Sequence, residues 1–291
     1  MQSGTPYSLG HELHPVIIIG AGRSGTKFVR SILAASRMCW IIPYDVGYIW
    51  RYRNESYPHD ALPPEIYDER IARFIRRQLV KLAHVPKHHT QGFIVEKSVP
   101  NTLRVAFVNA VLPDARFLHL IRDGRDVVES AVRQWNQNPD PRYLLKKIRY
   151  FPFSNMRYAF WYLKNMIGGK QGTSVWGPRY PGIEDDVRKL STLEVCARQW
   201  HFCLQTALDD LSTLPPDRQL TVRYEDLISD ENTVEGVCRF LSLPDTEDVL
   251  AYYRENILRD TRGKWQQLWS SAELQQVMDH IAPTLSRLNY T

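Results

Sequence analysis

The segment from Gly20 to Lys27 reads Gly-Ala-Gly-Arg-Ser-Gly-Thr-Lys, so glycines are interspersed with hydroxyl and cationic side chains. Glycine lets a backbone turn tightly and approach a ligand closely. Between a strand and a helix, the backbone N–H groups of such a loop and the helix N-terminus both attract an anion. Arg23 and Lys27 add positive charge, so the segment predicts a phosphate-binding cradle. Its predicted members are Gly22, Arg23, Ser24, Gly25, Thr26 and Lys27.

Two known kinds of anion-binding loop partly match this segment. The glycines satisfy the G-x-G-x-x-G spacing of dinucleotide-binding loops, and Asp45 stands at a loose version of the distance expected for their acid. Such loops hold the pyrophosphate mainly by backbone and need neither Arg nor Lys. The segment also nearly forms a nucleoside triphosphatase loop, but one residue is inserted before Lys27. Phe28 then stands where that loop has its magnesium ligand, so this ligand is missing at its usual place.

Another candidate residue is tied to the end of a predicted strand. Lys97 ends the strand predicted at 92–97. In parallel sheets, ligands bind at the carboxyl ends of the strands, so we expect this side chain near the cradle. Asp45 is the only acid in the loop after the first predicted helix. By position alone, it is better interpreted as a solvated loop residue or a helix cap.

The elements that must position these residues alternate between strand and helix signals. Short apolar runs between Gly and Pro residues predict strands, and apolar residues at helical spacing predict helices. The alternation predicts one α/β domain with a parallel sheet and an aromatic-rich helical insertion at 136–190. Strands are predicted at 16–19, 38–42, 92–97, 116–121 and 218–224. Helices are predicted at 26–35, 63–85, 98–112, 122–132, 191–214, 234–241 and 247–258, and from 270 onward.

The composition is that of a globular protein, with 43% hydrophobic residues and a net charge of +5 that suits an anionic ligand. No long block of one charge sign is present, which argues against nucleic acid as a partner. The four cysteines form no C-x-x-C pair and predict buried thiols. No apolar stretch reaches the length of a membrane span and no signal core is visible, so we expect no transmembrane segment and a cytoplasmic location. A chain separated from an anchor would show the same pattern.

Four motifs stand in order along the chain, at 22–27, 121–130, 222–227 and 262–265. Together they resemble the sulfotransferases that use 3′-phosphoadenosine 5′-phosphosulfate (PAPS), over nearly the whole chain. The resemblance is closer to the carbohydrate and protein-tyrosine type than to the cytosolic type with a histidine base. It implies a P-loop-type parallel sheet flanked by helices. It also implies an enzyme that moves a sulfuryl group from PAPS to a hydroxyl or amine, perhaps of a carbohydrate or aromatic alcohol, and releases adenosine 3′,5′-bisphosphate.

The donor carries a 5′-phosphosulfate and a separate 3′-phosphate, so it needs two anion sites. The cradle would supply the first, and Arg122 with Ser130 the second, since Ser130 lies about two turns into the following helix. The alternative for Arg122 is a salt bridge to a neighbouring aspartate. The resemblance implies that Tyr224, Arg262, Gly263 and Lys264 also contact the nucleotide. It further divides the single domain 1–291 into a nucleotide-binding half (15–135), an insertion that shapes the acceptor site (136–190) and a closing C-terminal half (191–291).

The resemblance also implies catalytic roles for Lys27, Asp45 and Lys97, with no metal. Lys27 would stabilise the leaving oxygen, and Lys97 would stand beside the sulfo group. The cytosolic members have a base histidine where this chain has Val99. The carbohydrate and protein-tyrosine members have a glutamate close to the position of Asp45, which makes Asp45 the first candidate base. Glu96 is the second candidate, with His59 or solvent as the remaining routes.

Two other functions stay open at this point. A nucleotide kinase on the same scaffold would depend on magnesium, and the missing magnesium ligand argues against it. A non-catalytic module that binds adenosine bisphosphate or sulfated glycans would show no turnover. The sequence leaves the acceptor and the oligomeric state open, although a small-molecule or glycan acceptor is expected.

Overall fold

Strand β1 (Glu12–Ile19) lies at the centre of a five-stranded parallel sheet in the order β2-β3-β1-β4-β5. The computed structural model describes residues 12–86, 89, 91–136, 175–257 and 262–290. The other strands are β2 (Cys39–Ile41), β3 (Gln91–Glu96), β4 (Arg116–Ile121) and β5 (Gln219–Arg223). All of them agree with the predicted strand positions within a few residues. The predicted α/β class with a parallel sheet flanked by helices is confirmed.

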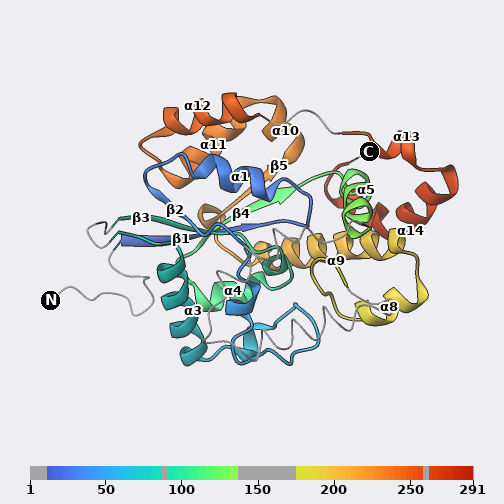
Figure 1. Cartoon of the computed structure of the whole chain (residues 1–291), viewed down its shortest axis with the longest axis horizontal. Helices are drawn as coiled ribbons and strands as arrows, with labels where there is room; N and C mark the ends of the chain where they lie inside the picture. The colour runs from blue at the N-terminus through green and yellow to red at the C-terminus, as the bar shows by residue number, and fades with distance from the viewer. Residues whose placement is uncertain (1–11, 87–88, 90, 137–174, 258–261, 291) are drawn as a thin grey trace.

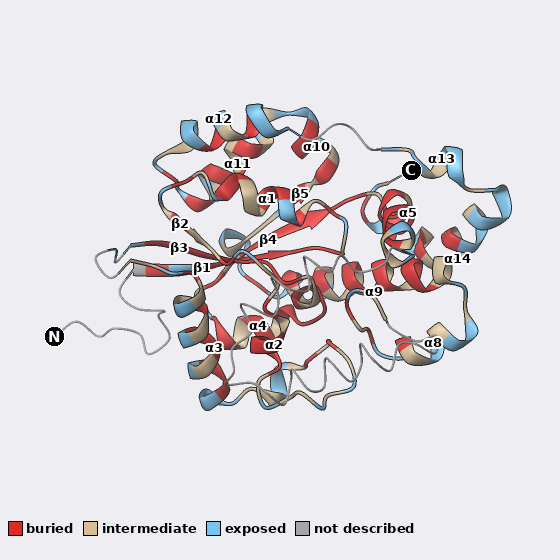
Figure 2. Cartoon of the chain, viewed as in Figure 1, coloured by how far each residue is buried: buried red, intermediate tan, exposed pale blue. Residues whose placement is uncertain are grey.

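Both faces of the sheet are covered, because successive side chains of a strand point to opposite faces. Val16 and Ile18 pack against one apolar cluster, and Ile17 and Ile19 pack against another. Figure 1 shows helices above and below the strands, and Figure 2 shows the central strands buried between them. The first cluster includes α1 (Thr26–Leu33), α10 (Tyr224–Ser229), α11 (Glu231–Leu241) and α12 (Thr246–Asn256). The second includes α2 (Gly47–Trp50), α3 (Glu69–Leu82), α4 (Val105–Val111) and the end of α9 (Thr192–Ser212).

A third apolar cluster extends the domain beyond the sheet, where α9 packs against α5 (Gly124–Trp135) and α14 (Ser271–Arg287). The predicted helix starts at 191 and 270 are confirmed, because Ser191 and Ser270 form capping boxes directly before α9 and α14. Two shorter helices, α8 (Ile183–Lys189) and α13 (Trp265–Leu268), pack against α9 and α5, respectively. Among the described residues, no helix is long and apolar enough to cross a membrane.

Two predicted helices are shorter than the sequence suggested. The prediction at 98–112 is divided into a 3₁₀ turn (Val99–Leu103) and α4, because Arg104 between them has an extended φ of −153°. The prediction at 63–85 begins with a separate 3₁₀ turn (Pro64–Ile66), and α3 starts only after Asp68, whose side chain caps it. A further 3₁₀ turn (Pro216–Arg218) leads into β5. Most of the predicted aromatic insertion, 137–174, lies outside the described residues.

Candidate active site

The predicted cradle links β1 to α1 at the carboxyl end of the central strand. Gly25 has a φ of +90°, and a Cβ there would lie 2.5 Å from the Tyr224 ring, so both conformation and packing require glycine. Thr102 fixes the start of the loop, since its hydroxyl accepts from the Gly20 N–H (2.9 Å) and donates to the Gly20 oxygen (3.0 Å). The loop is therefore held in one shape by residues far away in the sequence.

The hydroxyl side chains of the cradle are enclosed. Thr26 is buried, and Ser24 is fully buried with a side-chain oxygen that has no hydrogen-bond partner in the described part of the chain. Buried polar atoms without partners are rare and costly in folded proteins. A hydroxyl in this position, beside the N-terminus of α1, fits an anion held in the loop.

The second predicted anion site adjoins the cradle. The Arg23 Nε donates to the Ser130 Oγ (2.9 Å), and the Arg122 Nη1 donates to the backbone oxygen of Arg23 (3.1 Å). The Arg122 guanidinium lies 4.2 Å from the centre of the Tyr224 ring, which holds it toward the cradle. Asp123, an alternative partner for Arg122, forms an ion pair with Arg125 (2.7 Å). The two sites thus meet at Arg23, which the sequence placed in the first site alone.

The C-terminal motif reaches the same place. The Gly263 N–H donates to Asp126 Oδ1 (2.8 Å), and the Arg125 guanidinium lies 4.8 Å from the centre of the Trp265 ring. Both contacts attach the segment to the first turn of α5, the helix that carries Ser130. The predicted residues Arg262, Gly263 and Lys264 therefore lie close to the start of this helix.

The three predicted catalytic residues also come together. The Lys97 Nζ forms an ion pair with Asp45 Oδ1 (2.6 Å); the Lys97 side chain is 2% exposed and that of Asp45 34%. The Ser98 hydroxyl accepts from the Val46 N–H (2.8 Å) and so ties the Asp45 loop to the end of β3. Burial lowers the pKa of Lys27, and the positive charge of Lys97 lowers it further, so the two lysines lie within electrostatic reach.

Glu96, the second candidate base, lies within electrostatic reach of Asp45 but is enclosed. Its side chain is fully buried, and its Oε2 accepts from the Asn101 side chain (2.8 Å). Burial raises its pKa to about 7. Because Asp45 is partly exposed and Glu96 is not, the geometry favours Asp45 as the group that meets an acceptor. The His59 ring packs against the Tyr57 ring, with 4.9 Å between their centres.

Glu96→Gln is expected to stabilise the protein more at about pH 8 than at about pH 5. The folded-state pKa of about 7 exceeds the ordinary value of 4.5, so stability is lost as the pH rises between these values. Glutamine keeps the acceptor for Asn101 and does not ionise, so the variant escapes this loss of at most about 3 kcal/mol. Thermal unfolding of both proteins at the two pH values measures the difference. An identical pH dependence would contradict the buried position of the carboxyl group.

Some residues that hold the site in place were not found from the sequence. Thr102 and Ser98 act through contacts with partners 82 and 52 residues away, respectively. Trp176 lies against the cradle, because a Cβ at Gly22 would be 3.4 Å from its ring. It belongs to the predicted aromatic insertion, but no spacing distinguished it from the other aromatic residues there.

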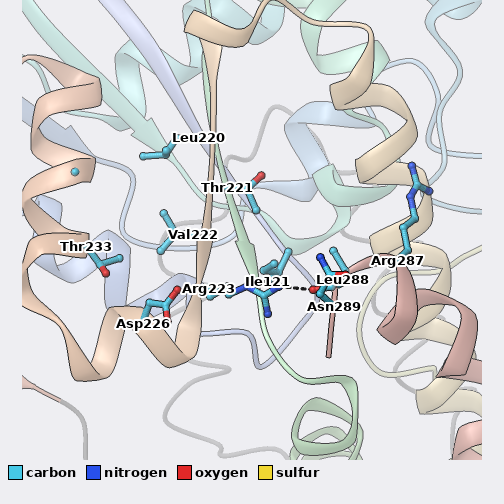
Figure 3. A pocket seen from close by; sticks show the side chains of 11 residues that line it. Ile121, Leu220, Thr221, Val222, Arg223, Asp226, Thr233, Arg287, Leu288 and Asn289 are labelled. Carbon is cyan, nitrogen blue, oxygen red and sulfur yellow. Dashed lines mark hydrogen bonds between the residues drawn. The ribbon is translucent and has the colours of Figure 1, made fainter. Parts of the chain in front are cut away.

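A surface pocket beside the edge strand β5 does not coincide with this site (Figure 3). Its lining residues come from β5, α10, α11, the ends of β4 and α14, and the segment directly after α14, among them Thr221, Thr233 and Leu288. The Arg223 side chain crosses it and donates to the backbone oxygen of Leu288. None of the residues predicted for catalysis or donor binding lines the pocket, so it does not mark the candidate site.

The described residues contain no group of three His, Cys, Asp or Glu side chains placed to hold a metal ion. This finding does not test whether the reaction proceeds without a metal, so the expectation of a metal-free reaction stays a prediction. All four cysteines are free and buried, which confirms their interpretation as buried thiols.

Comparisons with known proteins identify related chains. A family model described as "Sulfotransferase family" matches residues 15–166 and 170–248. The structure is similar to that of a sulfotransferase from Alicyclobacillus acidocaldarius, with a TM-score of 0.54, 15% identity and coverage of 94% of this chain and 93% of that chain. It is also similar to a sulfotransferase from Mycobacterium avium, with a TM-score of 0.54, 11% identity and coverage of 94% and 76%. At these identities the structural matches show a shared fold, and no curated protein matches the sequence.

Proposed function

The chain belongs to the sulfotransferase family and is an enzyme of that family, and from this premise we propose that PAPS is its donor and that a hydroxyl or amine is its acceptor. The observation that supports the donor is the meeting of two anion sites at Arg23. A donor with a 5′-phosphosulfate and a 3′-phosphate needs two such sites in one cleft of the protein. Because the sequence identity to the structural matches is low, the acceptor must be inferred from the residues of this chain alone.

The cradle residues 22–27 would hold the 5′-phosphosulfate through their N–H groups, the buried Ser24 hydroxyl and the cations of the loop. Arg122 and Ser130 would hold the 3′-phosphate, with Tyr224 fixing Arg122 in place. The loop at 262–264 would close over the nucleotide from the start of α5. Each of these roles follows the family resemblance and fits the contacts described above.

The reaction is an in-line displacement at sulfur. The acceptor oxygen or nitrogen forms a bond to sulfur while the bond from sulfur to the bridging phosphate oxygen breaks, and the bond's electron pair leaves with adenosine 3′,5′-bisphosphate. Lys27 and Lys97 stabilise the negative charge that gathers on the bridging and outer oxygens. The acceptor's proton goes to the Asp45 carboxylate. As Asp45 becomes neutral, Lys97 is released to interact with the sulfo oxygens.

The acceptor is best interpreted as a small molecule or glycan that presents a ring. Trp176 supports an acceptor with a ring, because its indole lies against Gly22 of the cradle. Val99 lies on the same side of the loop, since a Cβ built on Gly22 would be 3.9 Å from its side chain. The Gln199 side chain donates to the backbone oxygen of Trp176 (2.9 Å) and so fixes the residue that carries the ring. Flat aromatic side chains suit the faces of sugars and phenols.

Adenosine 3′,5′-bisphosphate is expected to bind the protein tightly without added metal. The two anion sites consist of backbone, hydroxyl and guanidinium groups, and Phe28 stands where a triphosphatase would hold magnesium. Titration calorimetry in a chelating buffer, with and without Mg²⁺, measures the affinity. A strict requirement for Mg²⁺ would overturn the donor assignment and favour a nucleotide kinase.

Turnover is tested by consumption of PAPS in the presence of a panel of sugars, phenols and amines, with the products identified by mass spectrometry. A sulfated product confirms the proposed reaction. Tight binding of the bisphosphate with no product from any acceptor would favour the non-catalytic binding module.

A further inference from the structure

Arg133 has no role in the function proposed so far, yet its side chain reaches the second anion site. We propose that Arg133 is a further binding residue for the 3′-phosphate of the donor, acting beside Arg122 and Ser130. This inference rests on the proposed use of PAPS and adds a residue that the motifs did not indicate.

The position of Arg133 follows from the geometry of α5. Ser130 and Arg133 are three residues apart, so they share one face of the helix. The Arg133 Nη2 lies 3.5 Å from the Ser130 Oγ, the same oxygen that accepts from the Arg23 Nε at 2.9 Å. Two guanidinium groups thus approach one hydroxyl from two different elements. A phosphate at this hydroxyl would lie within reach of both.

The charges around Ser130 do not balance one another. Burial lowers the pKa of Arg23, and the positive charges of Arg133 and Arg122 lower it further. The carboxylate of Glu129 opposes this effect and forms an ion pair with Arg133, in which Oε1 lies 3.4 Å from Nη1. Three guanidinium groups are therefore gathered near two buried acids, Glu129 and Asp126, of which Asp126 interacts with Arg122. The positive charges outnumber the negative ones, and a phosphate dianion would offset the excess.

The two members of this ion pair differ in solvent exposure. The Glu129 side chain is 8% exposed, whereas that of Arg133 is 48% exposed. Glu129 is fixed by its burial, but the Arg133 guanidinium can turn toward a ligand without disturbing the core. The arrangement holds Arg133 close to Ser130 and leaves donors of its planar fork available to phosphate oxygens.

The competing interpretation is that Arg133 only forms a helix-surface ion pair with Glu129, four residues before it. In that case its removal would leave nucleotide binding unchanged. The two interpretations differ in one measurable property, which is the dependence of the effect on the 3′-phosphate.

The test compares adenosine 3′,5′-bisphosphate with adenosine 5′-monophosphate, which lacks only the 3′-phosphate, by titration calorimetry on the full chain. Arg133→Ala is expected to weaken the bisphosphate about 10-fold and to leave the monophosphate within about 2-fold, since a charged hydrogen bond to phosphate is lost. Arg133→Lys should restore part of the affinity, because it keeps the charge but loses the fork. Arg122→Ala serves as the reference for loss of a 3′-phosphate contact.

Arg254→Ala is the matched control. Arg254 of α12 is 49% exposed and also forms ion pairs with glutamates, namely Glu231 of α11 and Glu247 of its own helix. The control should bind both nucleotides as the wild-type protein does. Equal effects of Arg133→Ala on both nucleotides, or no effect on either, would overturn the assignment of Arg133. If the wild-type protein bound no bisphosphate at all, the proposed donor itself would be wrong, so the two failures are distinguishable.

Discussion

Asp45→Asn is expected to lower turnover by about 10²–10⁴-fold, the usual cost of removing a general base, while adenosine 3′,5′-bisphosphate binds with unchanged affinity. The reason lies in the position of the carboxylate. It is partly exposed, it borders Lys97 at 2.6 Å, and its loop is tied to the end of β3. Asparagine keeps an oxygen for Lys97 but cannot take a proton from the acceptor. The measurements are kcat with an acceptor found in the panel, and nucleotide affinity by calorimetry.

Asp45→Glu and Glu96→Gln are the matched controls for this result. Asp45→Glu keeps a carboxylate at slightly longer reach, so it should retain more turnover than Asp45→Asn. Glu96→Gln removes a carboxyl group that is fully buried, so it should remain active. An active Asp45→Asn protein together with an inactive Glu96→Gln protein would move the role of base to Glu96. Activity in both variants would instead favour proton loss to a histidine such as His59 or to solvent.

Lys97→Met is expected to lower kcat by about 10²–10³-fold with a much smaller effect on donor affinity. Methionine has a similar length and can fill the enclosed space, but it carries no charge. The positive charge of Lys97 matters most when the oxygens around sulfur gain charge in the transition state, so its loss should affect kcat. Lys27→Met should act in the same direction, because Lys27 is proposed to stabilise the leaving oxygen as that oxygen gains charge.

Single-turnover rates and bisphosphate affinities of both lysine variants separate the two effects. A variant that lost only affinity would identify its lysine as a ground-state anchor for the donor. The double variant Asp45→Asn with Lys97→Met provides a second check. Because the two side chains form one ion pair, their effects on kcat should not add. Fully additive losses would contradict a shared role for the pair.

The sequence by itself determined the elements whose signals are local. The β-branched run at 16–19 between Pro15 and Gly20 specifies a buried strand, and the glycines after it specify the turn into α1. The Ser-x-x-Glu patterns at 191–194 and 270–273 specify helix starts, since both hydrogen bonds of a capping box form within four residues. The order of these elements was enough to predict a parallel sheet and to place the cradle at its carboxyl edge.

Only the tertiary structure decided which side chains meet. Lys97 and Asp45 are 52 residues apart, and Arg23 and Ser130 are 107 residues apart. Such contacts depend on strand order and on how each loop packs, and neither is encoded in the spacing of the residues concerned. Glu96 and Lys97 illustrate the limit, because Glu96 ends β3, a strand that is buried on both faces and shows no alternation of polar and apolar residues. Its sequence therefore could not show which of the two adjacent side chains pairs with Asp45.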